Sequence, residues 1–167
     1  MAVEKSPVEW ALTPLQKYAQ FSGRAPRAEY WWFYLFAIIA YIVVAMIDGV
    51  LGSTLVGPYG ILTGLLWLGL IVPTIAVGVR RLHDTNRTGW WMLAPLVPYI
   101  LGLLMMGPPI MDPAGAGMAA AGGAMIFMLI GSVMAIVLFV FTVLRGTQGP
   151  NNYGPDPYGA DVEQAFA

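Results

Sequence analysis

The chain alternates between long runs without any charged residue and short polar segments. The uncharged runs cover residues 30–47, 49–79, 88–111 and 113–144. A transmembrane helix needs roughly 17–25 predominantly apolar residues, because each residue rises about 1.5 Å across about 30 Å of hydrocarbon. The pattern therefore predicts four transmembrane helices, at about residues 29–50, 55–79, 89–106 and 124–144, the last starting either there or near Met118.

The segment before the first apolar run carries signals for a short additional helix. Residues 1–12 are expected to form a loose arm. Thr13 is placed to act as an N-cap, with Pro14 at the first helical position, where its missing N–H costs nothing. The following residues present one apolar face, which predicts an amphipathic helix lying in the membrane interface. Gly23 is expected to end that helix, and Pro26 to start the first transmembrane helix.

The predicted organisation is a single membrane domain with two polar flanks. Residues 1–28 form the arm with its amphipathic helix, and residues 29–144 form the four-helix transmembrane domain. The tail, residues 145–167, contains a Gly-, Pro- and Asn-rich segment that predicts a series of turns. The fold class is therefore an all-α membrane protein, a four-transmembrane-helix bundle with a turn-rich C-terminal tail.

The second predicted helix has three features that bear on packing. Gly60 and Gly64 form a Gly-x-x-x-Gly pair, which lets a neighbouring helix approach closely. Pro73 is expected to kink the helix, with a neighbouring group satisfying the carbonyl that it frees. Asp48, just before this helix, is expected at the membrane interface; an intramembrane carboxylate for ions is the alternative.

The basic residues are distributed on one side of this topology. They precede the first helix, separate the second from the third, or follow the fourth: Lys5, Lys17, Arg24, Arg27, Arg80, Arg81, Arg87 and Arg145. The loops at 48–54 and 107–123 contain none. By the positive-inside rule, both termini and the central polar segment are expected in the cytoplasm.

Composition agrees with a membrane location and excludes several chemistries. The sequence is 58% hydrophobic and 10% charged, against about 25% charged residues in a typical soluble domain. It contains no cysteine, so disulfides and thiolate metal sites are excluded. The net charge of −1 argues against nucleic-acid binding. No cleavable signal peptide is expected, so the first span should remain as an anchor.

Three polar motifs lie on the predicted cytoplasmic side. They read Phe-Ser-Gly-Arg-Ala-x-Arg-x-Glu-Tyr-Trp, Arg-Arg-Leu-His-Asp-Thr-x-Arg-x-Gly-Trp-Trp and Gly-Thr-x-Gly-x-Asn-x-Tyr-Gly-x-Asp-Pro. Together they resemble the bacterial domain-of-unknown-function 805 family over roughly residues 13–158. The resemblance implies a small multi-pass protein of the bacterial inner membrane, and it carries over no activity or catalytic residue. The chain departs from the family pattern at Thr88 and in its long loop at 107–123.

The pair His83 and Asp84 suggests acid–base or metal chemistry at first sight. A metal site needs at least three ligands, and the chain has one histidine and no cysteine. Ser22 could serve as a nucleophile, but no nucleophile-elbow sequence surrounds it. We therefore predict no catalytic residue, metal or cofactor. The expected role is a turn, in which Asp84 accepts backbone N–H bonds and His83 bridges to another cytoplasmic segment.

The remaining polar residues divide into a structural set and a ligand-binding set. Glu29 is expected to stabilise the start of the first helix and to pair with Arg80 or Arg81. The structural set is Glu29, Asp84, Arg87, Asn151 and Tyr153. The candidates for binding a ligand or headgroup are Arg24, Arg27, Arg80, Arg81, His83 and Trp90. The simplest role of Arg80 and Arg81 is to snorkel to lipid phosphates, and a defined anion or headgroup site is the alternative.

Function is the least determined property. The chain is expected to be a non-enzymatic scaffold or accessory subunit that contacts the lipid bilayer and other inner-membrane proteins. One alternative is binding or transport of an anionic lipid or small anion, and another is a membrane enzyme that uses His83 and Asp84. In each case, residues 79–91 are expected to contact both residues 23–30 and the C-terminal turns.

Overall fold

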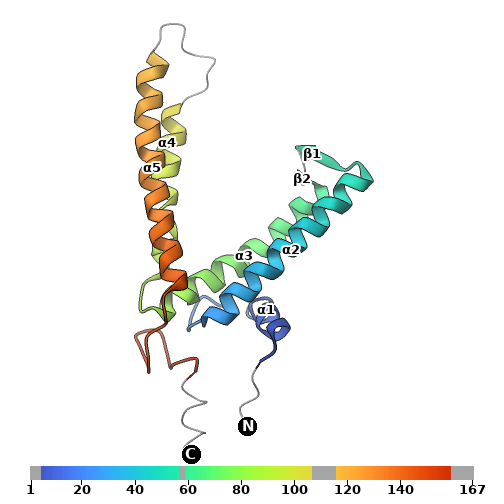
Figure 1. The fold of residues 1–167 in the computed structure, drawn as a ribbon, viewed down its shortest axis with the longest axis vertical. Coiled ribbons are helices and arrows are strands. Elements are labelled where there is room, and N and C mark those ends of the chain that lie inside the picture. The colour runs from blue at the N-terminus through green and yellow to red at the C-terminus, as the bar shows by residue number, and fades with distance from the viewer. Residues whose placement is uncertain (1–4, 57–58, 107–115, 159–167) are drawn as a thin grey trace, which may run out of the picture. The chain divides into compact units, whose positions relative to one another are not determined.

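The computed structural model describes residues 5–56, 59–106 and 116–158 (Figure 1). Within these residues the chain forms five α-helices, one 3-10 helix and a two-stranded hairpin. It divides into two units, Met1–Arg87 with Arg145–Ala167, and Thr88–Leu144. We call these the first and the second unit and describe each by itself.

Helix α1, Pro7–Gln16, opens the first unit. The Ser6 hydroxyl accepts a hydrogen bond from the Glu9 N–H (3.3 Å), and the Glu9 carboxylate accepts one from the Ser6 N–H (2.6 Å). This reciprocal capping box supplies two orphan donors with acceptors, so the helix starts here. The predicted start at Thr13 and Pro14 is therefore wrong, since both residues lie inside α1 and are buried.

Helix α2, Arg27–Leu51, begins directly after Pro26, as predicted, and ends at Gly52, which has a left-handed conformation (φ 65°). Strands β1, Thr54–Val56, and β2, Tyr59–Gly60, then pair in antiparallel fashion. Helix α3, Ile61–Asp84, follows. The predicted start of this helix near residue 55 is therefore wrong. Its end also lies further along the chain than expected, because the helix continues through the basic stretch to Asp84.

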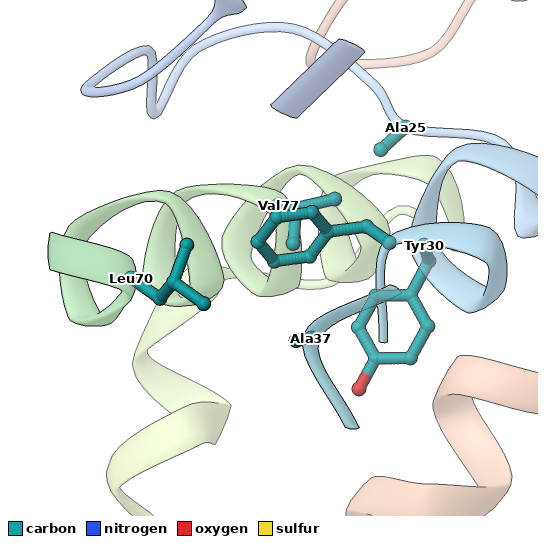
Figure 2. Close-up of a cluster of buried hydrophobic side chains, with 6 residues drawn as sticks. Ala25, Tyr30, Ala37, Leu70 and Val77 are labelled. Atoms are coloured by element: carbon teal, nitrogen blue, oxygen red, sulfur yellow. The ribbon is translucent and has the colours of Figure 1, made fainter. Parts of the chain in front are cut away.

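The apolar core of the first unit lies where α2 and α3 face each other. Its buried side chains are Ala25, Tyr30, Phe33, Ala37, Leu70 and Val77 (Figure 2). Leu15 of α1 packs against this cluster, so α1 is docked on the α2–α3 hairpin. In contrast, Ile38, Ile39 and Ile42 of α2 are each more than half exposed. An extended exposed apolar surface of this kind fits contact with lipid.

The second unit is a helical hairpin. The 3-10 helix η1, Gly89–Leu93, leads into α4, Leu96–Met106, which lies beside α5, Ala116–Val143 (Figure 1). A side chain at Gly131 would press on the ring of Tyr99, so the glycine permits the close approach of the two helices. The Tyr99 and Ser132 hydroxyls are 3.0 Å apart and share a hydrogen bond.

The number of long apolar helices differs from the predicted four. Three helices in the described part of the chain are long and apolar enough to cross a membrane: Arg27–Leu51, Ile61–Asp84 and Ala121–Val143. The predicted third span is a shorter apolar segment, Gly89–Met105, made of η1 and α4. Pro95 lies at the junction between them, where the missing N–H and the restricted preceding residue disfavour a continuous α-helix. The predicted fourth span corresponds to α5, whose start at Ala116 agrees better with the earlier alternative near Met118 than with residue 124.

Gly60 lies beside Asp48 and does not pair with Gly64 as predicted, and Asp48 caps a helix. Gly60 precedes α3 as its N-cap residue, and a Cβ there would overlap the Asp48 carboxylate. Gly64 faces open space among the described residues, so the pair does not join two helices within this unit. Asp48 is fully buried and accepts hydrogen bonds from the Thr63 N–H (2.8 Å), the Thr63 hydroxyl (2.7 Å) and the Ser53 hydroxyl (2.5 Å). It therefore caps the start of α3 from the end of α2.

Pro73 lies inside α3 and cannot donate to the carbonyl of Gly69. The Tyr18 hydroxyl donates a hydrogen bond to that carbonyl at 2.7 Å. The prediction that a neighbouring group would satisfy the freed carbonyl is confirmed, and the donor comes from the segment after α1.

We expect Tyr18→Phe to lower the free energy of unfolding by about 0.5–1.5 kcal/mol, the typical net contribution of one hydrogen bond. The measurement is a denaturant titration of the purified protein in mixed micelles. In a Pro73→Ala background, the backbone N–H restored at this position can donate to the Gly69 carbonyl, so the same substitution should cost less. An equal cost in both backgrounds would show that the hydroxyl does not act through the Gly69 carbonyl.

Candidate functional site

The polar end of the α2–α3 hairpin brings together three segments that are far apart in the sequence. They are residues 23–30, 80–87 and 145–158, which we call the cap. All three belong to the first unit. The expected contacts of the basic stretch with the segment before α2 and with the C-terminal turns are both present.

Asp84 is the centre of the cap. Its carboxylate accepts a hydrogen bond from Arg24 Nε on Oδ1 (2.9 Å) and one from Arg81 Nη1 on Oδ2. All three side chains are at most 4% exposed. The pairing leaves an excess of one positive charge, and hydrogen bonds to backbone carbonyls partly compensate it. The Asp84 carboxylate therefore binds arginines, and the expectation that it accepts backbone N–H bonds is wrong.

Arg24 extends these bonds to the C-terminal tail. Its Nη1 donates to the carbonyl of Gly149 (2.7 Å), and its Nη2 donates to the carbonyl of Thr147 (2.5 Å). The backbone carbonyl of Asp84 in turn accepts a bond from the Thr147 N–H (2.9 Å). A Cβ at Gly146 would overlap the Asp84 carboxylate, so only glycine lets the tail approach this closely. The tail is thereby fixed against the end of α3.

Glu29 and Arg80 form the second buried ion pair of the cap, between the first turn of α2 and α3. This confirms the predicted pairing and identifies Arg80 as the partner. Lys17 lies at the edge of the pair, with its Nζ 3.8 Å from the other Glu29 oxygen. The Arg80 Nε and Nη2 atoms have no hydrogen-bond partner within the described part of the chain. The pair therefore has more donors than acceptors.

The prediction that Arg80 and Arg81 snorkel to lipid phosphates is wrong. Their exposed fractions are 1% and 0%. The physical reason is the supply of counter-charge, because Glu29 and Asp84 hold both guanidinium groups inside the protein.

His83 joins the same three segments through different atoms. Its Nδ1 lies 3.2 Å from the Gly23 carbonyl, which can only accept, so this nitrogen carries the proton of the bond. The imidazole stacks on the ring of Tyr153, with centroids 3.9 Å apart and an interplanar angle of 6°. The His83 carbonyl accepts a bond from the Asn151 side chain (2.9 Å). His83 therefore bridges to another cap segment, and its ring is not oriented by Asp84.

The tail holds its own shape through Asp156. Its carboxylate accepts hydrogen bonds from the N–H groups of Tyr158 (3.0 Å) and Gly149 (2.9 Å). The bond from Tyr158, and to a lesser extent that from Gly149, lowers the pKa of Asp156 below its usual value, because both favour the charged form. Burial raises the pKa of the Tyr158 hydroxyl. Asn151 and Gly154 close a turn through two backbone bonds.

Three further residues were predicted to belong to the site: Arg27, Arg87 and Trp90. Arg27 is the first residue of α2 and lines a hollow of about 740 Å³, together with Arg145 and Tyr158. Arg87 donates a hydrogen bond to the carbonyl of Thr85 (3.0 Å). Trp90 lies in the second unit, where its side chain is 78% exposed. It is therefore not among the residues that the first unit brings together.

The sequence did not lead us to expect the backbone carbonyls that accept from Arg24, or the close approach of Gly146 to Asp84. The signal was available in the third motif, whose Gly-Thr-x-Gly spacing supplies a close approach at Gly146 and acceptors at Thr147 and Gly149. The described residues contain no group of three side chains suited to hold a metal. The arrangement as a whole is suited to fixing three chain segments together.

Long apolar helices with a buried ion-paired cluster at one end define a multi-pass helical membrane protein. The chain belongs to the DUF805 family, described as "Protein of unknown function (DUF805)", whose family model matches residues 18–155. This range includes the first two motifs and all but the last two residues of the third, so the resemblance based on them is confirmed.

Curated relatives place this family in the bacterial inner membrane. The chain is 35% identical over 150 residues to inner membrane protein YhaH of Escherichia coli strain K12, covering 90% of this chain and 97% of the relative. It is also 35% identical to inner membrane protein YhaI of that strain over 150 residues, covering 90% and 96%. The protein YiiR is 32% identical over 137 residues, covering 81% and 84%. No solved structure matches the chain.

Proposed function

We propose that this protein is a non-enzymatic scaffold or accessory subunit that binds other proteins of the inner membrane. The observation that carries the proposal is that the buried ionisable residues of the cap form ion pairs with one another. Arg24, Arg81 and Asp84 form one cluster, and Glu29 and Arg80 form the other. Such an arrangement gives a fixed surface, and it engages the Asp84 carboxylate with arginines rather than with His83.

The enzyme alternative has less support from the geometry. An acid–base pair of His83 and Asp84 requires the Asp84 carboxylate to meet a ring nitrogen of His83. In the cap, a backbone carbonyl engages His83 Nδ1, and the Asp84 carboxylate is shared by two arginines. This supports a structural role for both residues.

The proposal includes a topology of four crossings with both termini in the cytoplasm. Three long helices and the shorter Gly89–Met105 segment provide the crossings. The side-by-side packing of α4 and α5 supports the shorter crossing, because α5 can shield the α4 backbone from lipid. The cap then lies on the cytoplasmic side with all eight basic residues. In this topology α1 is positioned near the membrane interface.

A pair of reporter fusions tests the topology. A reporter that is active only in the periplasm should be inactive after Ala167 and active when inserted at residues 107–115. Activity after Ala167 would contradict the cytoplasmic termini. Activity at neither position would contradict the crossing by η1 and α4.

Partner capture tests the scaffold role. Cross-linking in intact cells, followed by affinity purification in detergent, should enrich the same integral membrane proteins in independent experiments. Asp84→Asn should reduce their recovery severalfold relative to equal amounts of Asp156→Asn, because only the first change removes the charge at the centre of the cap. Repeated captures that enrich no membrane protein with the unmodified chain would contradict a scaffold.

A further inference from the structure

A second hollow of the first unit is lined by only one of the buried arginines of the cap, Arg24. Its volume is about 750 Å³, and α1, the start of α2 and the tail contribute to its walls. The residues that matter here are Lys5, Trp10, Lys17, Glu29 and Trp32. We propose that this hollow binds the phosphate-bearing headgroup of an anionic membrane lipid.

The charges around the hollow favour an anion. Glu29 contributes a carboxylate, but this group is buried and committed to Arg80. Lys17 is 39% exposed and reaches the edge of the same pair. Lys5 is exposed, and its Nζ lies 4.9 Å from the ring centroid of Trp10. Two lysine ammonium groups therefore remain accessible to a ligand from α1 and its flanks.

The other two charged groups that line the hollow, Arg24 and Asp156, are already engaged. Arg24 donates to Asp84 and to two tail carbonyls. Asp156 accepts two backbone N–H bonds. The Asp156 carboxylate is therefore occupied by backbone donors, and the Arg24 guanidinium by internal acceptors. The donor surplus of Arg80 adds to the positive character of the surrounding cluster.

Two tryptophans indicate the depth of the hollow relative to the membrane. Trp32 belongs to the aromatic run at the start of α2 and is 39% exposed. Trp10 comes from α1 and also lines the hollow. Indole rings favour the headgroup region, where one part of the ring system is apolar and another can meet water. The lysines therefore lie at a level where lipid phosphates are the abundant anions.

This site differs from the headgroup site considered from the sequence. Of those candidates only Arg24 lines the hollow, and its guanidinium is engaged in internal bonds. The inference does not depend on the scaffold role, because lipid binding and partner binding can be measured separately.

Native mass spectrometry of the full chain, with phosphatidylglycerol or phosphatidylcholine added to the detergent, tests the proposal. Each lysine near a phosphate contributes about 1 kcal/mol, or roughly fivefold in affinity. The Lys5→Gln/Lys17→Gln variant should therefore bind phosphatidylglycerol roughly 25-fold more weakly. The matched control, Arg27→Gln/Arg145→Gln, removes the same charge from outside the hollow and should stay close to the unmodified protein. Equal losses in both variants would overturn the assignment.

Two further measurements are needed. One distinguishes a lipid phosphate from a soluble phosphate, and the other controls for misfolding of the lysine variant. Inorganic phosphate added alone should bind weakly and displace little phosphatidylglycerol. Lysine-dependent phosphate binding without any preference for phosphatidylglycerol over phosphatidylcholine would overturn the lipid assignment in favour of a soluble anion. The Lys5→Arg/Lys17→Arg variant keeps the charge and should keep the lipid preference, whereas loss of that preference at an unchanged melting temperature would contradict a site based on charge.

Discussion

Asp84→Asn is expected to lower the free energy of unfolding by about 3–5 kcal/mol, the range found when one partner of a buried ion pair is removed. The substitution keeps the size of the side chain but removes its charge. Arg24 and Arg81 would then be buried side by side without a counter-ion. Their mutual repulsion and their desolvation would both oppose folding.

The matched control is Asp156→Asn, which removes the same charge from a carboxylate in the same cap. Asp156 is half-buried and bonded to backbone N–H groups. Its loss should cost about 1 kcal/mol, as for one or two ordinary hydrogen bonds. Unfolding in mixed micelles gives both values. Similar costs for the two variants would show that the buried arginines do not depend on Asp84.

The long apolar helices were the most predictable part of the fold. Uncharged runs placed α2 and α5 close to their observed positions, because membrane thickness sets a minimum length for an apolar helix. The errors occurred at the helix ends. Ser6 and Glu9 supplied a capping box that outweighed the Thr13 signal. The apolar run after residue 54 is typical of a helix, but Thr54–Val56 and Tyr59–Gly60 form two paired strands before α3.

The cap was predictable as a meeting of three motifs, but its pairing was not. The topology predicted from the sequence placed Arg24, Glu29 and Asp84 on one side of the membrane, and it left several arginines able to pair with either carboxylate. The choice depends on which faces of α2 and α3 meet. In α3, Arg81 and Asp84 are three residues apart and pair along the helix, while Arg80 points to α2. That geometry requires the three-dimensional packing.

The same packing gives a test of how much the second ion pair stabilises the cap. Glu29→Gln should cost about 3–5 kcal/mol, because it leaves Arg80 buried with a neutral neighbour. Adding Arg80→Met should recover most of that loss, and Glu29→Leu/Arg80→Met should come close to the unmodified protein. A buried pair can often be replaced by apolar residues of similar volume with little loss, since the desolvation penalty disappears with the charges.

If the double variant recovers the free energy of unfolding, the effect of the ion pair on lipid binding can be measured apart from its effect on stability. Glu29 also carries the edge contact with Lys17, so the double replacement leaves this lysine without its carboxylate neighbour. Unfolding titrations of Glu29→Leu, Arg80→Met and Glu29→Leu/Arg80→Met, compared with the unmodified protein, give the coupling energy of the Glu29–Arg80 pair. A double variant as unstable as Glu29→Gln would show that the site requires polar partners for Lys17 or the surrounding backbone. A stable double variant with altered lipid binding would show that the buried pair sets the electrostatic potential of the hollow and contributes little to folding.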